Sequence, residues 1–376
     1  MYKFEDLIEE VKEFNTDLRY GLDDIVGVTI EKGLIPTIAN LTQTALDKFY
    51  IIKPETFVYN PRTHGVRLGM GYNDTCNTYI TTWNNVAFRV KDTAKNIVIP
   101  QYLWLYFCRP VWDRLTNFLA WGSSTIVFAW KDFLTIEIDL PSITRQREIV
   151  AEYETLTRRI RINEQMIQNL ESTAQTLYRK MFVDGIDKEN LPDGWRMGNL
   201  GEVAKYVNEK ISLSKISESV YISTENMLKD KMGIVVSMNK PDEGKGTKFQ
   251  IDDILISNIR PYFKKIWRAS FCGASSNDVL CFRTEKDFNA SMLYYTLEQD
   301  TFFDYVMAGS NGVKMPRGDK EWIMKYPIII PSNNEIKEYQ ETTNCIRKQN
   351  EFFKQENSKL TELQSLLLAK MGYKTQ

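Results

Sequence analysis

The sequence predicts an α+β protein in which two globular α/β domains form a pseudo-twofold repeat, separated by two long antiparallel coiled-coil helices. Three observations favour this class. The length of 376 residues exceeds the ~100–200 residues of a typical single domain. The second half repeats landmarks of the first half in the same order, and two long segments carry heptad spacing. The predicted division is 1–143 and 186–332 for the domains and 144–185 and 333–376 for the helices.

Five landmarks recur in the two halves at offsets confined to 187–198 residues. They are two strand-like runs, an aromatic helical stretch, a small-residue turn, and an apolar run whose proline introduces a long helix. Each match is weak by itself, so the shared order predicts the duplication. The pairs are FVYNPR (57–62) with ILISNIRP (254–261), VAFR (86–89) with LCFR (280–283), QYLWLYFCRPVWDRL with SMLYYTLEQDTFFDYV, AWGSST (120–125) with MAGSNG (307–312), and IEIDLPSITRQREI (136–149) with YPIIIPSNNEIKEY (326–339).

The first long helix is expected at about 144–181 and the second at about 334–371. In the first, a largely apolar seam of ten positions with 4-3 spacing runs from Ile149 to Met181. In the second, an apolar column recurs every seven residues from Tyr339 to Leu367, and a weaker companion column holds Thr343, Asn350, Asn357 and Gln364. Such seams are typical of a coiled coil, which at about 37 residues would form a rod of roughly 55 Å. Asn163 and Asn350 occupy seam positions near the midpoints, so we expect them to face each other and set the register. The alternative is two solvated asparagines beside an imperfect seam.

Composition and charge restrict the class of protein. Hydrophobic residues make up 43% and charged residues 26%, as in ordinary globular proteins. The N-terminus lacks a basic, apolar leader and no run approaches ~18 apolar residues, so we expect a cytoplasmic protein without a membrane segment. The net charge of −1 argues against a strongly basic nucleic-acid binder. Residues 1–24 contain eight acids and three bases, a net of −5, which leaves +4 for a mildly basic remainder.

The sequence predicts no catalytic residue, no metal site and no bound cofactor. The five cysteines are scattered without a C-x-x-C pair, and the single histidine, His64, excludes histidine-rich metal sites. Phosphate-binding, dinucleotide-binding and nucleophile-elbow motifs are missing. NPRT (60–63) resembles only the start of the N-P-P-[YF] signature of amino-methyltransferases, so a self-contained methyltransferase is not predicted.

Basic and aromatic residues alternate without an acid in SNIRPYFKKIWR (257–268). Bases can hold phosphates or guanine edges and aromatic rings can pack on sugars, so this segment predicts contact with double-stranded DNA. A solvated strand face over an aromatic core would have a similar sequence. The small-residue turns, followed by bases, supply further donors. The candidate DNA-binding residues are Arg62, Arg67, Ser123, Ser124, Lys131, Arg260, Tyr262, Lys264, Lys265, Arg268, Asn311, Lys314 and Arg317.

Four phrases together resemble the specificity (S) subunit of type I restriction–modification systems. They are LPDGWRMGNLGEVAKY (191–206), DDILISNIRPYFKK (252–265), LPSITRQREIVAEY (140–153) and TELQSLLLAKM (361–371). Two features depart from the family pattern. The first half lacks the G-W-x-x-x-x-L-G opening and is expected to start with an acidic amphipathic helix, and Pro331 is not followed by the family glutamine.

The resemblance implies that each half holds a target recognition domain that reads one part of a bipartite DNA sequence. The helices would set the gap and dock modification (M) subunits, which would supply S-adenosylmethionine and adenine methylation. Restriction (R) subunits would join the same complex to make an ATP-dependent nuclease. The chain itself would then be non-catalytic and bind no cofactor. The alternatives are a nuclease with scattered carboxylates, and a coiled-coil scaffold that binds no DNA.

Overall fold

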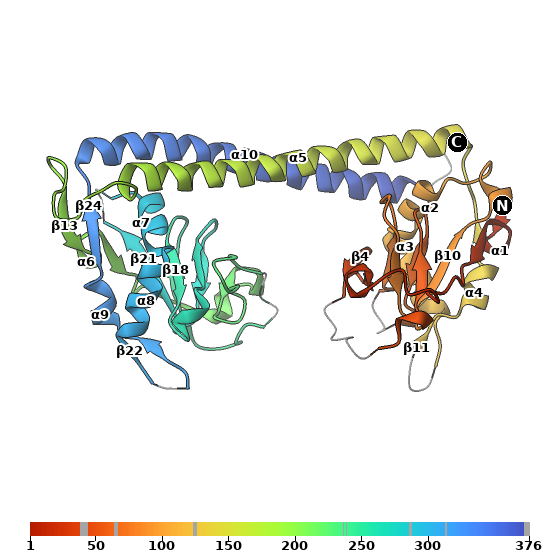
Figure 1. Ribbon diagram of the computed structural model, residues 1–376, viewed down its shortest axis with the longest axis horizontal. Helices are drawn as coiled ribbons and strands as arrows, with labels where there is room; N and C mark the ends of the chain where they lie inside the picture. Colours follow the sequence, from red (N-terminus) through yellow and green to blue (C-terminus); the bar gives the residue numbers. More distant parts are fainter. Residues whose placement is uncertain are drawn as a thin grey trace. The chain divides into compact units, whose positions relative to one another are not determined.

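The protein is described by a computed structural model that covers residues 1–37, 44–63, 67–122, 126–235, 237, 239–285, 288–312 and 314–371. The chain divides into two compact units, unit 1 (Met1–Asn163 with Lys354–Gln376) and unit 2 (Glu164–Phe353). Each unit combines a domain of strands and short helices with part of both long helices (Figure 1). The predicted α+β class is confirmed. The division between the units crosses both long helices, whereas the sequence-based boundaries were placed at the ends of the helices.

Unit 1 is built on a six-stranded antiparallel sheet with the strand order β2-β10-β6-β8-β3-β4. Two-stranded pairs β1–β12, β5–β9 and β7–β11 complete its β-structure. The strands are short and rich in β-branched and aromatic residues, which suit a pleated, half-buried surface. Their bounds are β1 (Tyr2–Lys3), β2 (Ile8–Glu10), β3 (Val26–Thr29), β4 (Gly33–Pro36), β5 (Tyr50–Ile52), β6 (Phe57–Tyr59), β7 (Arg62–Thr63), β8 (Met70–Tyr72), β9 (Tyr79–Thr81), β10 (Val86–Val90), β11 (Ile126–Val127) and β12 (Glu137–Ile138).

Short helices and an aromatic core complete unit 1. Both α2 and α3 begin with a proline, which lacks the N–H that would have no intrahelical acceptor there. Phe57, Phe88, Phe107 and Phe133 are fully buried, and most of their ring pairs meet edge to face, as aromatic quadrupoles favour. The helices are α1 (Phe4–Leu7), α2 (Pro100–Phe107), α3 (Pro110–Leu119) and α4 (Trp130–Thr135), with 3-10 turns at Leu22–Asp24, Leu46–Lys48 and Asp92–Ala94.

Unit 2 contains two four-stranded sheets with the orders β14-β21-β18-β19 and β15-β17-β20-β16. Neighbouring strands are antiparallel except β16 and β20. The strands are β13 (Arg196–Asn199), β14 (Ala204–Tyr206), β15 (Lys210–Ser212), β16 (Tyr221–Ile222), β17 (Lys245–Phe249), β18 (Ile254–Ser257), β19 (Ile266–Arg268), β20 (Gly273–Ser275), β21 (Val279–Thr284), β22 (Ser310–Asn311), β23 (Arg317–Gly318) and β24 (Pro327–Ile330). The helices are α6 (Leu200–Val203), α7 (Ala290–Leu297), α8 (Asp300–Ala308) and α9 (Lys320–Met324), with 3-10 turns at Leu213–Lys215, Glu218–Val220 and Pro261–Phe263 (η6).

The two units share one topology, which confirms the duplication expected from the ordered landmarks. Strands β2-β10-β6-β8 of unit 1 have the same order and antiparallel pairing as β14-β21-β18-β19 of unit 2. The helix pair α2–α3 corresponds to α7–α8, and the strand pair β1–β12 corresponds to β13–β24. The largest difference lies outside the repeated landmarks: unit 1 extends its main sheet by β3 and β4, whereas unit 2 has the separate four-stranded sheet β15-β17-β20-β16.

The N-terminal segment differs from the acidic amphipathic helix expected from the sequence. Only Phe4–Leu7 is helical, and Ile8–Glu10 forms a strand that pairs with β10. Strand pairing within the sheet therefore overrides the local helical pattern of the charged residues. In unit 2, α6 is likewise flanked by strands β13 and β14. The N-terminal residues thus supply the structure that residues 196–206 supply in unit 2, although the G-W-x-x-x-x-L-G phrase is missing.

The equivalence of α1 and α6 extends to their caps. The backbone N–H of Lys3 donates to Asp6 Oδ2 at 3.2 Å, and the backbone N–H of Asn199 donates to Glu202 Oε1 at 2.9 Å. An acid at the third helical position satisfies an N–H that the short helix leaves unpaired. The acidic residues that suggested a long helix therefore include the cap of a single-turn helix.

The long helices are α5 (Ile143–Phe182) and α10 (Asn333–Lys370), compared with the expected 144–181 and 334–371. All ten predicted seam positions of α5 are buried or half-buried, and both predicted columns of α10 are covered in the same way. The helices pair antiparallel in each unit. In unit 1 Gln364 Nε2 donates to Thr157 Oγ1 at 2.7 Å, and in unit 2 Tyr339 Oη donates to the carbonyl of Ala174 at 3.4 Å.

A polar side chain anchors the start of each long helix to its domain. The side chain of Gln146 is fully buried, where it donates to the carbonyls of Ile97 and Pro141 and accepts from the N–H of Ile99. This glutamine is the one present in the phrase LPSITRQREI. The start of α10 lacks it, and there Glu335 accepts hydrogen bonds from Trp195 Nε1 and Ser332 Oγ. A different polar contact thus fixes the second helix.

The expected contact between Asn163 and Asn350 is wrong. Asn163 Nδ2 donates to Glu356 Oε2 and to Asn357 Oδ1, both at 2.8 Å, which uses both of its amide hydrogens within unit 1. Glu356 also pairs with Arg159. Asn163 therefore belongs to a polar layer with Asn357, a member of the weaker seam column, because the antiparallel register sets residue 163 opposite 357. Whether Asn163 or Asn350 sets the register stays a prediction.

We expect the double substitution Asn163→Leu with Asn357→Leu to raise the free energy of unfolding by about 1–3 kcal/mol. The side-chain oxygen of Asn163 is buried without a hydrogen-bond partner in the described residues, and removing such a group relieves a desolvation cost. Thermal unfolding of the full chain measures the change. Asn169→Leu, at an exposed position of the same helix, is the control and should leave the melting temperature unchanged. A lower melting temperature of the double variant would contradict this interpretation.

Candidate nucleic-acid interface

In unit 2 the candidate surface begins at the loop that joins β18 to β19. The loop contains η6, and the residues on either side of it, Arg260 and Lys264, adopt the left-handed conformation with φ of 51° and 49°. This conformation costs a residue other than glycine roughly 1–3 kcal/mol and is concentrated at functional sites. The loop therefore holds a defined, strained shape.

The hairpin β22–β23 is joined to this loop by backbone contacts. The N–H of Arg260 donates to the carbonyl of Pro316 at 2.8 Å, and Ile259 forms a β-bridge with Arg317. The basic aromatic segment and the small-residue turn, which the sequence identified separately, thus form one surface. This surface lies at the end of unit 2 remote from α10 (Figure 1).

The side chains on this surface offer cationic and aromatic groups. Arg260 is half-buried, and its Nε is buried without an acceptor among the described residues. The ring of Tyr262 is 46% exposed, and Asn311 and Lys314 are exposed on the hairpin. Arg317 is also exposed but pairs with Asp278 at 3.3 Å. A buried donor that lacks an acceptor costs free energy, so Arg260 would gain from an external acceptor such as a phosphate or a guanine edge.

Lys229 also belongs to this surface, although no sequence pattern indicated it. Its Nζ lies 4.2 Å from the ring centroid of Phe263, within the range of a cation–π interaction. Two backbone hydrogen bonds hold its segment against the loop, from Asp230 N to the carbonyl of Phe263 and from Lys231 N to that of Lys264. Lys229 reaches this surface through a tertiary contact between segments that are distant in sequence. A search for linear motifs does not detect such a contact.

Lys264 and Lys265 have partners inside unit 2. Lys264 Nζ pairs with Asp300 at 2.9 Å, and this hydrogen bond raises the pKa of the lysine. Lys265 Nζ donates to the carbonyl of Thr224 at 2.6 Å, while burial and the charge of Lys229 lower its pKa. DNA contact by either lysine would require the loss of these partners, so their roles stay predictions.

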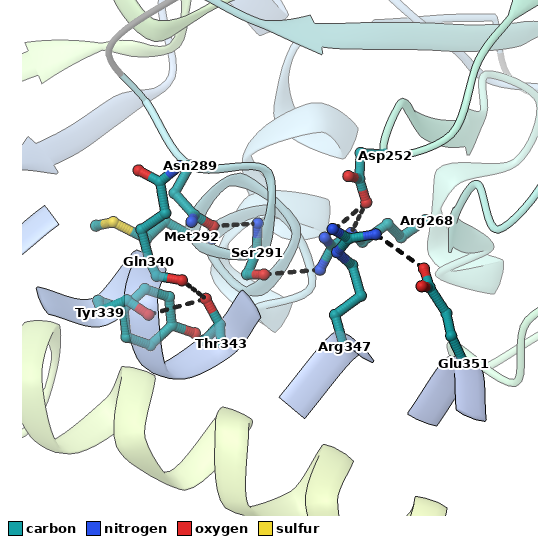
Figure 2. Close-up of polar contacts among 10 residues, drawn as sticks. All are labelled: Asp252, Arg268, Asn289, Ser291, Met292, Tyr339, Gln340, Thr343, Arg347 and Glu351. Atoms are coloured by element: carbon teal, nitrogen blue, oxygen red, sulfur yellow. Dashed lines mark hydrogen bonds and ion pairs between the residues drawn. The ribbon is translucent and has the colours of Figure 1, made fainter. Parts of the chain in front are cut away.

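Arg268, a further predicted DNA contact, also has partners inside unit 2, so its role stays a prediction. Its Nε and one terminal nitrogen donate to Asp252 Oδ1 at 3.0 and 2.6 Å, and the other donates to Ser291 Oγ of α7 at 2.7 Å. Figure 2 shows this network beside α10. The charge of Arg268 also acts on Tyr339 of α10, whose pKa burial raises. Strands β18 and β19 run across unit 2. The start of the basic segment, at Arg260, therefore lies on the loop surface, and its end, at Arg268, lies beside α10.

Unit 1 brings the equivalent segments together. Strand β7 carries Arg62 and pairs with β11, in the register Arg62 to Val127, and the N–H of Phe128 donates to the carbonyl of Pro61 at 2.8 Å. Arg62 and Arg67 are exposed, and neither side chain has an ion pair in the part of the chain that is described. Both arginines are therefore accessible to an external anion.

Several sequence-based candidates cannot be placed. Ser123, Ser124 and His64 lie outside the described residues. Across the described ranges, no three histidine, cysteine, aspartate or glutamate side chains form a group that would hold a metal ion. Within the same ranges, no helix is both long enough and apolar enough to cross a membrane.

These features define a class of fold, an α+β chain with two repeated domains and two long antiparallel helices. No protein-family model matches the sequence, and no curated protein matches it. Among solved structures, the chain is similar to the type I restriction–modification S subunit from M. genitalium, with a TM-score of 0.53 and 14% identity, over 100% of this chain and 96% of that chain. The protein therefore has the fold of a type I restriction–modification specificity subunit.

Two further structures are similar over nearly the same extent. One chain comes from a study of complex assembly and conformational transition of the type I R-M system, with a TM-score of 0.49, 16% identity, and coverage of 98% of this chain and 96% of that chain. The other is the HsdS subunit from Thermoanaerobacter tengcongensis, with a TM-score of 0.38, 17% identity, and coverage of 98% and 95%.

Proposed function

We propose that this chain is the sequence-specific DNA-binding subunit of a type I restriction–modification complex. The observation that carries the proposal is the recurrence of one surface in both units: an arginine-bearing segment after a central strand, joined through its backbone to the residues that follow the small-residue turn. Two such surfaces would each read one part of a bipartite target. Arginine suits this role because its guanidinium can contact guanine edges or phosphates. The fold shared with the M. genitalium S subunit supports the same role.

The long helices are proposed to set the gap between the two parts of the target. A continuous helix of 40 residues is roughly 60 Å long, so a rigid helix pair would convert half-site spacing into a property of the protein. Their exposed faces are proposed to dock M subunits and, in the complete complex, R subunits. S-adenosylmethionine would then be bound by the M subunits and ATP by the R subunits. The chain itself would contribute recognition and no catalytic group.

We expect Arg260→Ala to weaken binding to duplex DNA and to reduce the slope of log affinity against log salt by about one, if the guanidinium contacts a phosphate. A contact with a guanine edge would instead cost about 1–3 kcal/mol and relax the sequence preference. Gel shifts of the full chain with its M subunits, over a series of salt concentrations, measure both. Unchanged affinity at every salt concentration would assign Arg260 a structural role only.

Arg268→Ala is the matched control, because it removes the same charge from the same segment at the end that lies against the helix. We expect it to lower the melting temperature through loss of the contacts with Asp252 and Ser291. The salt slope of the folded variant should equal that of the wild type. If Arg268→Ala reduced the salt slope as much as Arg260→Ala does, the total positive charge of the chain, and not the loop surface, would govern binding.

A further inference from the structure

Unit 1 exposes two large aromatic side chains next to its candidate surface. Phe118, in the last turn of α3, is 84% exposed, and Trp121, which follows the helix, is 67% exposed. Side chains of this size usually bury most of their area, and exposed apolar groups close together mark interaction sites. Phe118 is three residues before Trp121, whose backbone pairs with Val127, the residue opposite Arg62.

The corresponding place in unit 2 is built differently. In the repeat offset of 187 between the small-residue turns, Phe118 corresponds to Tyr305 and Trp121 to Ala308. The Tyr305 ring stacks on Trp322 of α9, with centroids 4.8 Å apart and an angle of 14°. Trp121 thus has no aromatic counterpart, and the counterpart of Phe118 is covered by another ring. The exposed aromatic pair is therefore specific to unit 1 and is not a requirement of the shared fold.

The backbone holds Trp121 in place although its side chain is exposed. The N–H of Trp121 donates to the carbonyl of Val127 at 3.2 Å, and the N–H of Val127 donates back at 3.1 Å. Val127 in turn pairs with Arg62 of β7. Because the backbone is already fixed, only the side-chain torsions of Trp121 lose freedom when the indole contacts a partner, which favours binding.

The charges around the aromatic pair fit a polyanion. Lys131 Nζ lies 6.0 Å from the Trp121 ring centroid, and Arg62 is on the neighbouring strand. Arg114 is exposed one helical turn before Phe118, hence on the same side of α3. An apolar protein partner would not require these three cationic side chains. Duplex DNA combines phosphates for the cations with base and sugar faces for the rings.

We infer that Phe118 and Trp121 form an aromatic DNA contact that has no equivalent at the same place in unit 2. The indole of Trp121 would pack into a groove and wedge against a base step, while Lys131 and Arg62 hold the flanking phosphates. Proteins that insert apolar wedges read how easily a step deforms. Unit 1 would then add a response to the deformability of its half-site to the cationic contacts that both units offer. This inference rests on the proposed DNA-binding function.

The test compares Trp121→Ala and Trp121→Phe with the wild-type full chain, bound to M subunits, on a mixed-sequence duplex. Base–aromatic stacking is worth enough that we expect Trp121→Ala to weaken binding about tenfold, and Trp121→Phe to recover part of the loss. The salt slope should stay unchanged, because an apolar contact releases no counterion, whereas Arg62→Ala should lower it by about one. Trp83→Ala, another exposed tryptophan of unit 1, is the control and should bind normally.

Incorporation of 5-fluorotryptophan adds a readout on the wild-type side chain itself, with Trp121→Phe used only to assign the resonance. The fluorine resonance assigned through Trp121→Phe should shift when the duplex is added. Unchanged affinity of Trp121→Ala, with weakened binding by Arg62→Ala, would overturn the inference and leave the proposed function intact. If the wild type binds no duplex, both fail. Self-association that is lost in Trp121→Ala would overturn the inference in favour of a second copy of the chain as the partner.

Discussion

Phe4→Ala is expected to lower the free energy of unfolding by about 3–5 kcal/mol, the usual range for removal of a buried phenylalanine. Phe4 is fully buried, and its ring contacts those of Phe107, Trp112 and Phe133, with centroids 5.0–5.7 Å apart. Truncation would leave a cavity lined by large rigid rings, which relax little. The loss should appear in urea denaturation of the full chain followed by tryptophan fluorescence, since Trp112 reports on this core.

The control for Phe4 is the exposed neighbour Tyr2, whose substitution by alanine should change stability by no more than about 0.5 kcal/mol. Leu200→Ala gives a second comparison, because Leu200 occupies the same position in α6 and is also fully buried. It should cost about 2–5 kcal/mol. An effect of Phe4→Ala as small as that of Tyr2→Ala would contradict the finding that the N-terminal segment belongs to the first domain.

Asp253→Ala is expected to have a comparable effect in unit 2, about 3–5 kcal/mol, because it leaves a partly buried arginine without its partner. The Asp253 side chain is 1% exposed and accepts two hydrogen bonds from Arg283 at 2.8 and 2.7 Å and one from the N–H of Gln250. The pair ties the start of β18 to β21. Chemical denaturation should show that Asp253→Ala is less stable than the wild type. The salt slope of DNA binding should not change.

Asp252→Ala is the matched control for this prediction. Asp252 is adjacent in sequence, and its side chain is 37% exposed in the ion pair with Arg268. An ion pair of this exposure contributes roughly 1 kcal/mol or less. A similar loss in both variants would show that the strand terminus, and not the buried pair, determines the effect.

The ordered landmarks were sufficient to predict the duplicated topology, because each one marks an element of the shared core. LCFR and VAFR became the central strands β21 and β10, and the heptad seams became α5 and α10. Strand and helix periodicity is local, so it can be recognised without knowledge of tertiary contacts. The N-terminus was misjudged because Ile8–Glu10 is a strand only through its pairing with β10.

The phrase DDILISNIRPYFKK contains both structural and surface residues, and the sequence alone does not separate them. Asp253 and Ser257 are buried, and Ser257 Oγ donates to the carbonyl of Ile259. These residues support the loop that presents Arg260. Unit 1 has Thr56 before its matching strand, and there Arg89 pairs with Glu9. The phrase thus describes how the loop is held, while the chemistry of recognition depends on residues around it.

The candidate site could be predicted only in part, because tertiary contacts decide which cations are accessible. Arg260 and Arg268 lie in one basic segment, yet β19 carries Arg268 to Asp252 and Ser291. Lys229 reaches the same surface from a distant loop. The register of the long helices also had to be seen, since Asn163 meets Asn357. Linear spacing contains neither kind of information.

We propose that this chain selects a bipartite DNA sequence for modification by its partners. Methylation-sensitive sequencing of the host genome, with the gene intact and deleted, tests it most directly. We predict that deletion removes adenine methylation from one motif made of two short sequences with a fixed gap, and that the intact gene carrying Arg260→Ala reduces methylation at that motif. An identical pattern of adenine methylation with and without the gene would contradict the account.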